Sequence, residues 1–279
     1  MRKFAFVVFD VDDTVLARTP LDLVTDISGL GWKLKLSAIS GDVADVLTKV
    51  VQEKSEIKCK VNFLGNGYQK YAALSQWLQK YSTVSARVAL EYDDGENKRY
   101  VEGKVTAFSK TEIDEYQNLA CDLSFCTLSP FFIHKGNLIR MRVSAVGKSY
   151  PFVYPYYYGK NVLQNTEIEN PYIAEIPLTV KIAGAISTPR VALLDEEKQA
   201  YNVVSFPNIT LGEGQYIIIN SAAKRIWFFD GAKLRDYTAE TDPQFDTFLM
   251  AKSGLSNISV NLDASGSGEL TGSWRQYTL

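Results

Sequence analysis

Apolar and polar residues alternate with a period of two along most of the chain, which is the pattern of half-buried β-strands. The first half shows it in the short runs 32–36 and 57–63 and in the longer runs 84–92 and 99–108. The two longer runs flank Asp93–Asn97, whose Asp-Gly step is typical of a hairpin turn. The alternation therefore predicts several antiparallel strands in the first half.

One segment of the first half has helical periodicity instead. After the turn at residues 65–67, apolar side chains recur at intervals of three and four and form a single stripe. The stripe consists of Tyr68, Tyr71, Leu74, Leu78 and Tyr81, with Trp77 beside it. We predict an amphipathic helix of about four turns here, and a weaker helix or a loop over residues 40–52. One good helix among antiparallel strands indicates an α+β domain.

The second half alternates almost throughout, and turn residues separate its strands. The candidate strands are 174–182, 190–194, 200–206, 215–219, 224–229, 245–250, 257–262 and 269–277. A series of short strands of this kind predicts a β-sandwich or jelly roll.

An aromatic and proline-rich segment, 150–159 (YPFVYPYYYG), separates the two halves. Its two prolines oppose a central strand, and its rings oppose a flexible linker. We predict an ordered connector whose tyrosines pack between two domains, with Tyr154, Tyr156, Tyr157 and Tyr158 as the candidates. The predicted organisation is a domain at 1–135, a connector at 136–160 and a domain at 161–279. We leave open that the last strand returns to the first domain.

Composition and charge narrow the function classes. The 279 residues are 46% hydrophobic, enough for a sizeable core, and 30 basic against 32 acidic residues give a net charge of −2. That balance provides no general attraction for nucleic acid or for an anionic membrane. No apolar run reaches the length of a membrane span, and acidic residues follow the N-terminus too closely for a signal peptide. We expect a soluble protein in a reducing compartment, without nucleic-acid or membrane partners.

Few residues are suited to catalysis or metal binding. The chain has one histidine, His134, and three cysteines, Cys59, Cys121 and Cys126. A single histidine excludes zinc sites that need two, and three cysteines do not form a disulfide framework. Cys121 and Cys126 lie five residues apart on one predicted strand and therefore face opposite sides. We predict small buried hydrophobic residues, and no catalytic, cofactor-binding or metal site.

The segment Asp10–Thr14 (DVDDT) follows the apolar run 4–9 and resembles the first motif of the haloacid dehalogenase phosphatases. That resemblance would make Asp10 the nucleophile and Asp12 the acid/base beside a magnesium ion. The phosphatase fold, however, needs parallel strands that alternate with helices, whereas tight turns here favour antiparallel pairing. We interpret the segment as an acidic turn before a short strand at 15–17, and keep the phosphatase as a remote alternative.

A second alternative is a carbohydrate-binding β-sandwich. The aromatic run Trp227–Phe229 and the connector tyrosines offer rings on which sugars can stack, and β-sandwiches are common lectin scaffolds. The simpler interpretation is that these rings fill the core and the domain junction, and the sequence does not separate the two.

From end to end, the order of features resembles the distal tail proteins (Dit) of siphophages that infect Gram-positive bacteria. The segments that carry the resemblance are Gly67–Leu78 (GYxKYxxLxxWL), Leu119–Phe132, Asn170–Pro171, Pro177–Leu193, Gly214–Asn220 and Phe248–Ile258. These segments are packing and turn signatures, and they span nearly the whole chain.

This resemblance implies a mainly β, non-enzymatic structural protein of a phage, prophage or tail-like particle. It implies an N-terminal α+β domain, an antiparallel sandwich-like sheet with one helix, that forms a homo-hexameric ring or two stacked rings, and a C-terminal galectin-like β-sandwich. The implied partners are the tail tube protein, the tail-associated hub or lysin and the receptor-binding proteins. The implied location is the virion tail tip, after synthesis in the bacterial host cytoplasm. We predict that the helix stripe, Tyr68, Tyr71, Leu74, Trp77, Leu78 and Tyr81, takes part in the ring interface.

Overall fold

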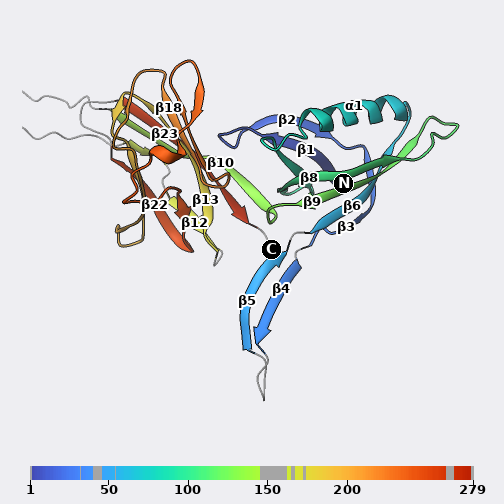
Figure 1. Ribbon diagram of the computed structural model, residues 1–279, viewed down its shortest axis with the longest axis horizontal. Helices are drawn as coiled ribbons and strands as arrows, with labels where there is room; N and C mark the ends of the chain where they lie inside the picture. Colours follow the sequence, from blue (N-terminus) through green and yellow to red (C-terminus); the bar gives the residue numbers. More distant parts are fainter. Residues whose placement is uncertain are drawn as a thin grey trace, which may run out of the picture. The chain divides into compact units, whose positions relative to one another are not determined.

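The chain forms two compact units (Figure 1). Both consist mainly of β-strands, which confirms the predicted fold class. The computed structural model describes residues 2–31, 33–39, 46–53, 55–144, 162–164, 167–171, 174–261 and 267–277. Unit 1 comprises Met1–Asp10, Val15–Ile133 and Tyr277–Leu279, and unit 2 comprises Val11–Thr14 and His134–Gln276.

Unit 1 consists of an antiparallel sheet with one helix and a separate two-stranded sheet, β4-β5. Its elements are β1 (Lys3–Phe9), β2 (Val15–Pro20), β3 (Leu23–Ser28), β4 (Lys33–Ile39), β5 (Val46–Glu53), β6 (Glu56–Phe63), α1 (Gly67–Lys80), β7 (Arg87–Asp93), β8 (Lys98–Lys110) and β9 (Leu119–Thr127). The strands follow the order β2-β1-β7-β8 along one row and β3-β6-β9-β8 along another. The first residues of β8 pair with β7 and the later ones with β9, so this long strand joins the two rows.

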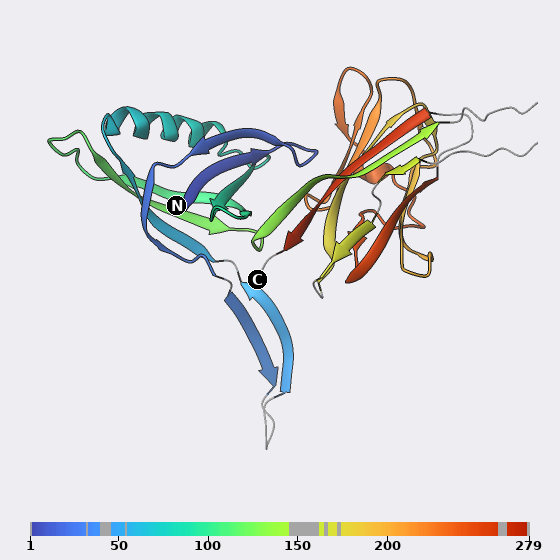
Figure 2. The same cartoon turned by 180° about the vertical axis from the view of Figure 1, so that it is seen from behind.

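Helix α1 lies across one face of this sheet in both views (Figures 1 and 2). It contacts β6 and β9, and Leu74 is buried in the core that these strands share with β1. The ring of Trp77 stacks on Phe6 with centroids 6.2 Å apart. The predicted helix is confirmed to within one residue at each end, because its apolar stripe is the face that meets the sheet.

The backbone conformation and close packing of the turn before α1 explain why residues 65–67 are Gly-Asn-Gly. Asn66 adopts the left-handed conformation with φ of +53°. A Cβ atom on Gly67 would lie 2.7 Å from the Cβ of Leu119, so the helix start and β9 approach too closely for any side chain. The Gly67 amide donates a hydrogen bond to the Gln117 carbonyl at 2.9 Å, which anchors the helix start.

One prediction for unit 1 was wrong. Part of segment 40–52, expected as a weak helix or a loop, is strand β5, which pairs antiparallel with β4. The run Val46-Leu-Thr-Lys-Val-Val-Gln52 is rich in β-branched residues, which prefer strands once a partner strand is present. Residues 40–45 lie outside the described residues.

Unit 2 contains two larger antiparallel sheets. Strand β10 (Phe132–Ser144) begins in unit 1, and the elements of unit 2 are β11 (Val162–Gln164), β12 (Glu167–Asn170), β13 (Ile176–Gly184), β14 (Ile186–Ser187), β15 (Arg190–Leu194), β16 (Ala200–Ser205), β17 (Thr210–Leu211), β18 (Tyr216–Asn220), β19 (Arg225–Phe229), β20 (Leu234–Asp236), the 3-10 helix η1 (Thr238–Glu240), β21 (Met250–Ala251), β22 (Gly254–Asn261) and β23 (Ser267–Tyr277). One sheet has the order β10-β23-β13-β18-β19-β20, and the other has the order β12-β22-β15-β16.

The two sheets of unit 2 provide a large apolar core. In the central strand β13, five consecutive residues from Ile176 to Val180 are buried, and β18 and β23 pair with its two edges. Strand β15 instead alternates, with Val191 and Leu193 buried. The continuous burial of β13 indicates that side chains on both of its faces are covered, whereas the alternating burial of β15 indicates that only one face is covered.

One strand prediction for unit 2 was mostly wrong. Of the predicted strand 245–250, only Met250 is in a strand, β21, because the preceding residues form a loop that aspartate side chains hold. Asp242 accepts a hydrogen bond from the Gln244 amide at 3.0 Å, and Asp246 bonds the backbone of Val203. Strand β10 continues to Ser144, and the connector tyrosines Tyr154, Tyr156, Tyr157 and Tyr158 lie outside the described residues.

Candidate functional sites

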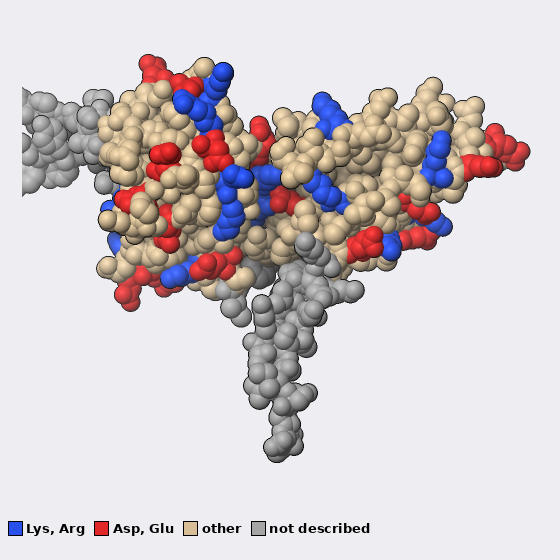
Figure 3. Space-filling view, in the orientation of Figure 1, with Lys and Arg blue, Asp and Glu red and all other residues tan. Residues whose placement is uncertain are grey.

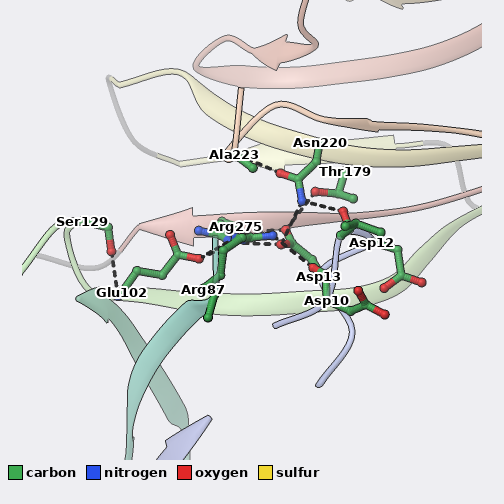
Figure 4. A network of polar contacts seen from close by, with 12 residues as sticks. Asp10, Asp12, Asp13, Arg87, Glu102, Ser129, Thr179, Asn220, Ala223 and Arg275 are labelled. Carbon is green, nitrogen blue, oxygen red and sulfur yellow. Dashed lines mark hydrogen bonds and ion pairs between the residues drawn. The ribbon is translucent and has the colours of Figure 1, made fainter. Parts of the chain in front are cut away.

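The acidic turn after β1 contains one buried aspartate, Asp13, which belongs to a polar network of unit 2 (Figure 4). Asp13, with φ of +63°, and Arg275 of β23 are each only 2% exposed. Their closest N–O distance is 2.9 Å. Thr179 of β13 donates to the same carboxylate at 2.8 Å, and Asn220 of β18 donates at 3.2 Å. Both carboxylate oxygens therefore accept two hydrogen bonds each, which compensates the cost of burying the charge.

The hydrogen bonds of this turn give it a structural role: they close the turn and attach it to strands of unit 2. β1 and β2 pair antiparallel, so the DVDDT segment does not lie in the parallel frame that the phosphatase motif requires. Asp12 accepts hydrogen bonds from the amide and the hydroxyl of Thr14 and thereby closes the turn. The sequence motif points to Asp10 and Asp12 but not to Asp13, whose partners come from distant strands.

An apolar groove of about 620 Å³ lies beside the C-terminal half of α1 in unit 1. Four of the six predicted ring-interface residues line it: Tyr71, Trp77, Leu78 and Tyr81. Leu74 is buried in the core, whereas Tyr68 is 59% exposed and has the ammonium group of Lys110 4.5 Å from its ring centre. The structure thus places most of the stripe against the core of its own unit and along the wall of the groove.

Two further apolar residues extend the groove to the surface. Val84 is fully exposed and Leu128 is 56% exposed. The Lys104 ammonium donates to the carbonyls of Thr83 and Ala86 at 2.7 Å each, so it holds the loop that presents Val84. Burial lowers the pKa of Lys104. A well-positioned exposed valine beside an apolar groove is typical of an interaction surface.

The cysteines do not form a reactive or metal-binding group. Burial raises the pKa of Cys59 and of Cys121 to about 11, so both are thiols at neutral pH. Cys121 is buried and Cys126 half-buried on β9, which agrees with the opposite orientation predicted for them. Across the described residues, no group of three or more His, Cys, Asp or Glu side chains is placed to hold a metal ion.

The aromatic run in β19 packs within unit 2. The ring of Phe229 stacks on Tyr216 with centroids 4.7 Å apart, and Phe228 contacts Tyr237 at 5.5 Å. Trp227 is half-buried.

Surface charge gives no indication of a nucleic-acid site on the face drawn in Figure 3. Acidic and basic side chains are interspersed there among a larger area of uncharged residues. Within the part of the chain that the structure describes, no helix is long and apolar enough to cross a bilayer.

Comparison with solved structures identifies the fold. The chain superposes with a TM-score of 0.71 and 15% identity on a chain of the phage p2 baseplate in its activated conformation with strontium, over 100% of this chain and 99% of that one. A calcium-bound form of the same baseplate gives a TM-score of 0.69 and 16% identity, again over 100% of this chain and 99% of that one. The Dit protein of phage SPP1, described as a paradigm of the hub adsorption apparatus in phages that infect Gram-positive bacteria, gives 0.56 and 13% over 99% of both chains.

Sequence comparison assigns the N-terminal region. Residues 16–128 match the family described as "Distal tail protein, N-terminal domain". A comparison with curated protein sequences gave no significant match. The match over residues 16–128 and the fold shared along the chain agree with the resemblance to distal tail proteins.

Proposed function

We propose that this protein is a non-enzymatic ring protein at the tip of a phage tail, and that it joins the tail tube to the hub. The observation that carries the proposal is the match of residues 16–128 to the distal tail protein N-terminal domain, combined with a baseplate-type fold over the full chain. In the virion, unit 1 forms a homo-hexamer, as one ring or two stacked rings. Unit 2, as a galectin-like domain, holds the receptor-binding proteins.

The distribution of exposed apolar residues supports unit 1 as the ring-forming part. Within the described residues, most of the exposed large hydrophobic side chains belong to unit 1. They are Val15, Leu16, Leu23, Leu64, Tyr68, Val84, Ile113, Tyr116 and Leu128, against Leu234, Phe245 and Leu255 in unit 2. Contiguous patches of exposed apolar side chains mark surfaces that a partner covers, and a closed ring requires two such surfaces on every subunit.

We assign one of these two surfaces to the groove beside α1, with Val84 and Leu128 at its rim. A neighbouring subunit that covers this rim would remove both side chains from water, and the groove wall already contains the partly buried rings of Tyr71 and Tyr81. Burial of apolar area contributes about 25 cal/mol per Å². The helix stripe then acts in two ways: one side stabilises the subunit, and the other meets its neighbour.

Negative-stain electron microscopy of the purified protein tests the ring. We expect sixfold ring-shaped particles, and we expect the double variant Val84→Lys/Leu128→Lys to abolish them because it places two charges in the contact. The matched control is Leu255→Lys, a change of similar chemistry at a 46% exposed position of unit 2. Rings that persist in the double variant would reject the groove as the contact, and the absence of rings from the unmodified protein would reject the ring itself.

A further inference from the structure

A polar pocket of about 430 Å³ lies in unit 2, away from every surface assigned above. Its walls come from Tyr201 and Asn202 of β16, from Lys224 just before β19 and from segment 246–252, which includes β21. A volume of this size falls within the range of small-ligand sites, about 300 to 1,000 Å³. Trp227, the aromatic residue that suggested sugar binding from sequence, is not among the lining residues.

Hydrogen bonds between the strands hold the walls of the pocket. The Asp246 carboxylate accepts from the Val203 amide at 3.0 Å, and the Asp246 amide donates to the Val203 carbonyl at 2.8 Å. The Asn202 side-chain oxygen accepts from the Met250 amide at 3.2 Å, which orients its NH₂ group as a remaining donor. The loop at 245–249, where a strand was expected, is thus fastened to β16 and shapes one side of the pocket.

Two lysines are positioned by aromatic rings at this pocket. The ammonium of Lys224 lies 4.9 Å from the ring centre of Phe248, and that of Lys252 lies 4.6 Å from the ring centre of Tyr201. The Tyr201 hydroxyl bonds the Ser256 hydroxyl at 2.7 Å, which fixes the second ring. Cation–π contacts restrict these long side chains before a ligand arrives, so less conformational entropy is lost on binding.

The charges of the pocket cancel, and this determines the class of ligand. Two lysines, Lys224 and Lys252, and two carboxylates, Glu175 and Asp246, are among the lining residues. A site for phosphate or another anion would carry an excess of positive charge, whereas this one offers donors and acceptors in balance. Hydroxyl groups, each of which donates one hydrogen bond and accepts two, match such a lining.

From this balance we propose that the pocket binds a neutral saccharide, recognised through its hydroxyl groups. The lysines and the Asn202 amide donate to sugar oxygens, and the Asp246 and Glu175 carboxylates accept from sugar hydroxyls. The lysines already cover the two aromatic rings, so recognition depends on hydrogen bonds more than on ring stacking. This binding activity goes beyond the structural role proposed above.

Saturation-transfer difference NMR on the full-length protein tests this proposal. The probes are maltotriose, lactose and the N-acetylglucosamine trimer as neutral saccharides, with glycerol 3-phosphate as the anionic comparison. We expect transfer to at least one neutral saccharide and none to glycerol 3-phosphate. The absence of transfer to all three neutral saccharides, or transfer to glycerol 3-phosphate alone, would overturn the proposal.

A pair of matched variants locates the binding. Lys224→Ala/Lys252→Ala removes both ammonium groups at exposed positions, and we expect at least tenfold weaker binding of the saccharide. Lys233→Ala removes an exposed lysine elsewhere in the same unit, and we expect unchanged binding. Equal affinity in the double variant would reject this pocket as the site. Circular dichroism checks that each variant is folded, and ring formation remains a separate measurement.

Discussion

The buried Asp13–Arg275 pair allows a quantitative prediction about unit 2. Replacement of Asp13 by Asn keeps the shape of the side chain and its tolerance of the left-handed conformation but removes the charge. Arg275, which is 2% exposed, would then be a buried cation that has lost its ion pair with Asp13. Breaking a buried pair in this way costs about 3 to 5 kcal/mol, and we expect Arg275→Met to cost a similar amount because it removes the guanidinium that balances the buried charge of Asp13.

The double variant measures the coupling energy between Asp13 and Arg275 separately from the loss of stability in each single variant. In Asp13→Asn/Arg275→Met neither buried charge remains, so we expect its loss of stability to be close to that of one single variant. The coupling energy would then be about 3 to 5 kcal/mol. The control is Arg225→Met, which removes an exposed ion pair with Asp236 and should cost less than about 1 kcal/mol.

Hydrogen exchange measured by mass spectrometry is the suitable assay, because it reports unit 2 separately from unit 1. We expect the peptides that cover β13 and β23 to lose protection in both single variants, because Thr179 and Arg275 belong to these strands. Single variants that leave this protection unchanged, or a double variant whose loss equals the sum of the two, would refute the reasoning.

Three further outcomes are expected. Burial raises the pKa of Cys59 and Cys121 to about 11. A thiol reagent at pH 7.5 should therefore leave both residues unmodified in the folded protein and react with all three cysteines in urea. Rapid labelling of Cys59 or Cys121 in the native state would contradict this. Backbone hydrogen bonds lower the pKa of Asp94, so its contribution to the β7–β8 hairpin is complete above about pH 4 and is lost as the pH falls through the lowered pKa. In urea titrations, Asp94→Asn should reduce stability at pH 7 and reduce it progressively less at lower pH. A loss that does not change with pH would count against this. Gly67→Ala should destabilise unit 1 by about 1 to 3 kcal/mol in the same titrations, because the new Cβ would lie 2.8 Å from a backbone nitrogen of β9. An unchanged midpoint of urea unfolding would contradict this and show that the start of the helix can move.

Local sequence patterns predicted the helix and the strands whose conformation depends mainly on neighbouring residues. The helix at Gly67–Lys80 and the strand at Arg190–Leu194 have clear periodicities and turn residues at their ends, and both lie where they were expected. Segment 245–249 alternates like a strand but forms a loop, because the side chain and the amide of Asp246 both bond the backbone of Val203 on β16. A local pattern cannot reveal partners on another strand.

Local sequence patterns could not predict the buried contacts of Asp13 for the same reason. Asp13 is separated from Thr179 by 166 positions, from Asn220 by 207 and from Arg275 by 262. As a sequence motif, the DVDDT segment suggests catalysis, whereas three strands of unit 2 convert its last aspartate into a structural anchor. The polar pocket likewise combines residues from four separate parts of the chain, and the sequence analysis assigned none of them.

The native mass of the protein tests the central claim most directly. Light scattering coupled to size-exclusion chromatography should give six times the chain mass of 31.2 kDa, about 187 kDa, or twice that for stacked rings. The Val84→Lys/Leu128→Lys variant should elute as a monomer. A mass of 31.2 kDa for the unmodified protein at every concentration would contradict the proposal that this tail-tip protein is a self-assembling ring.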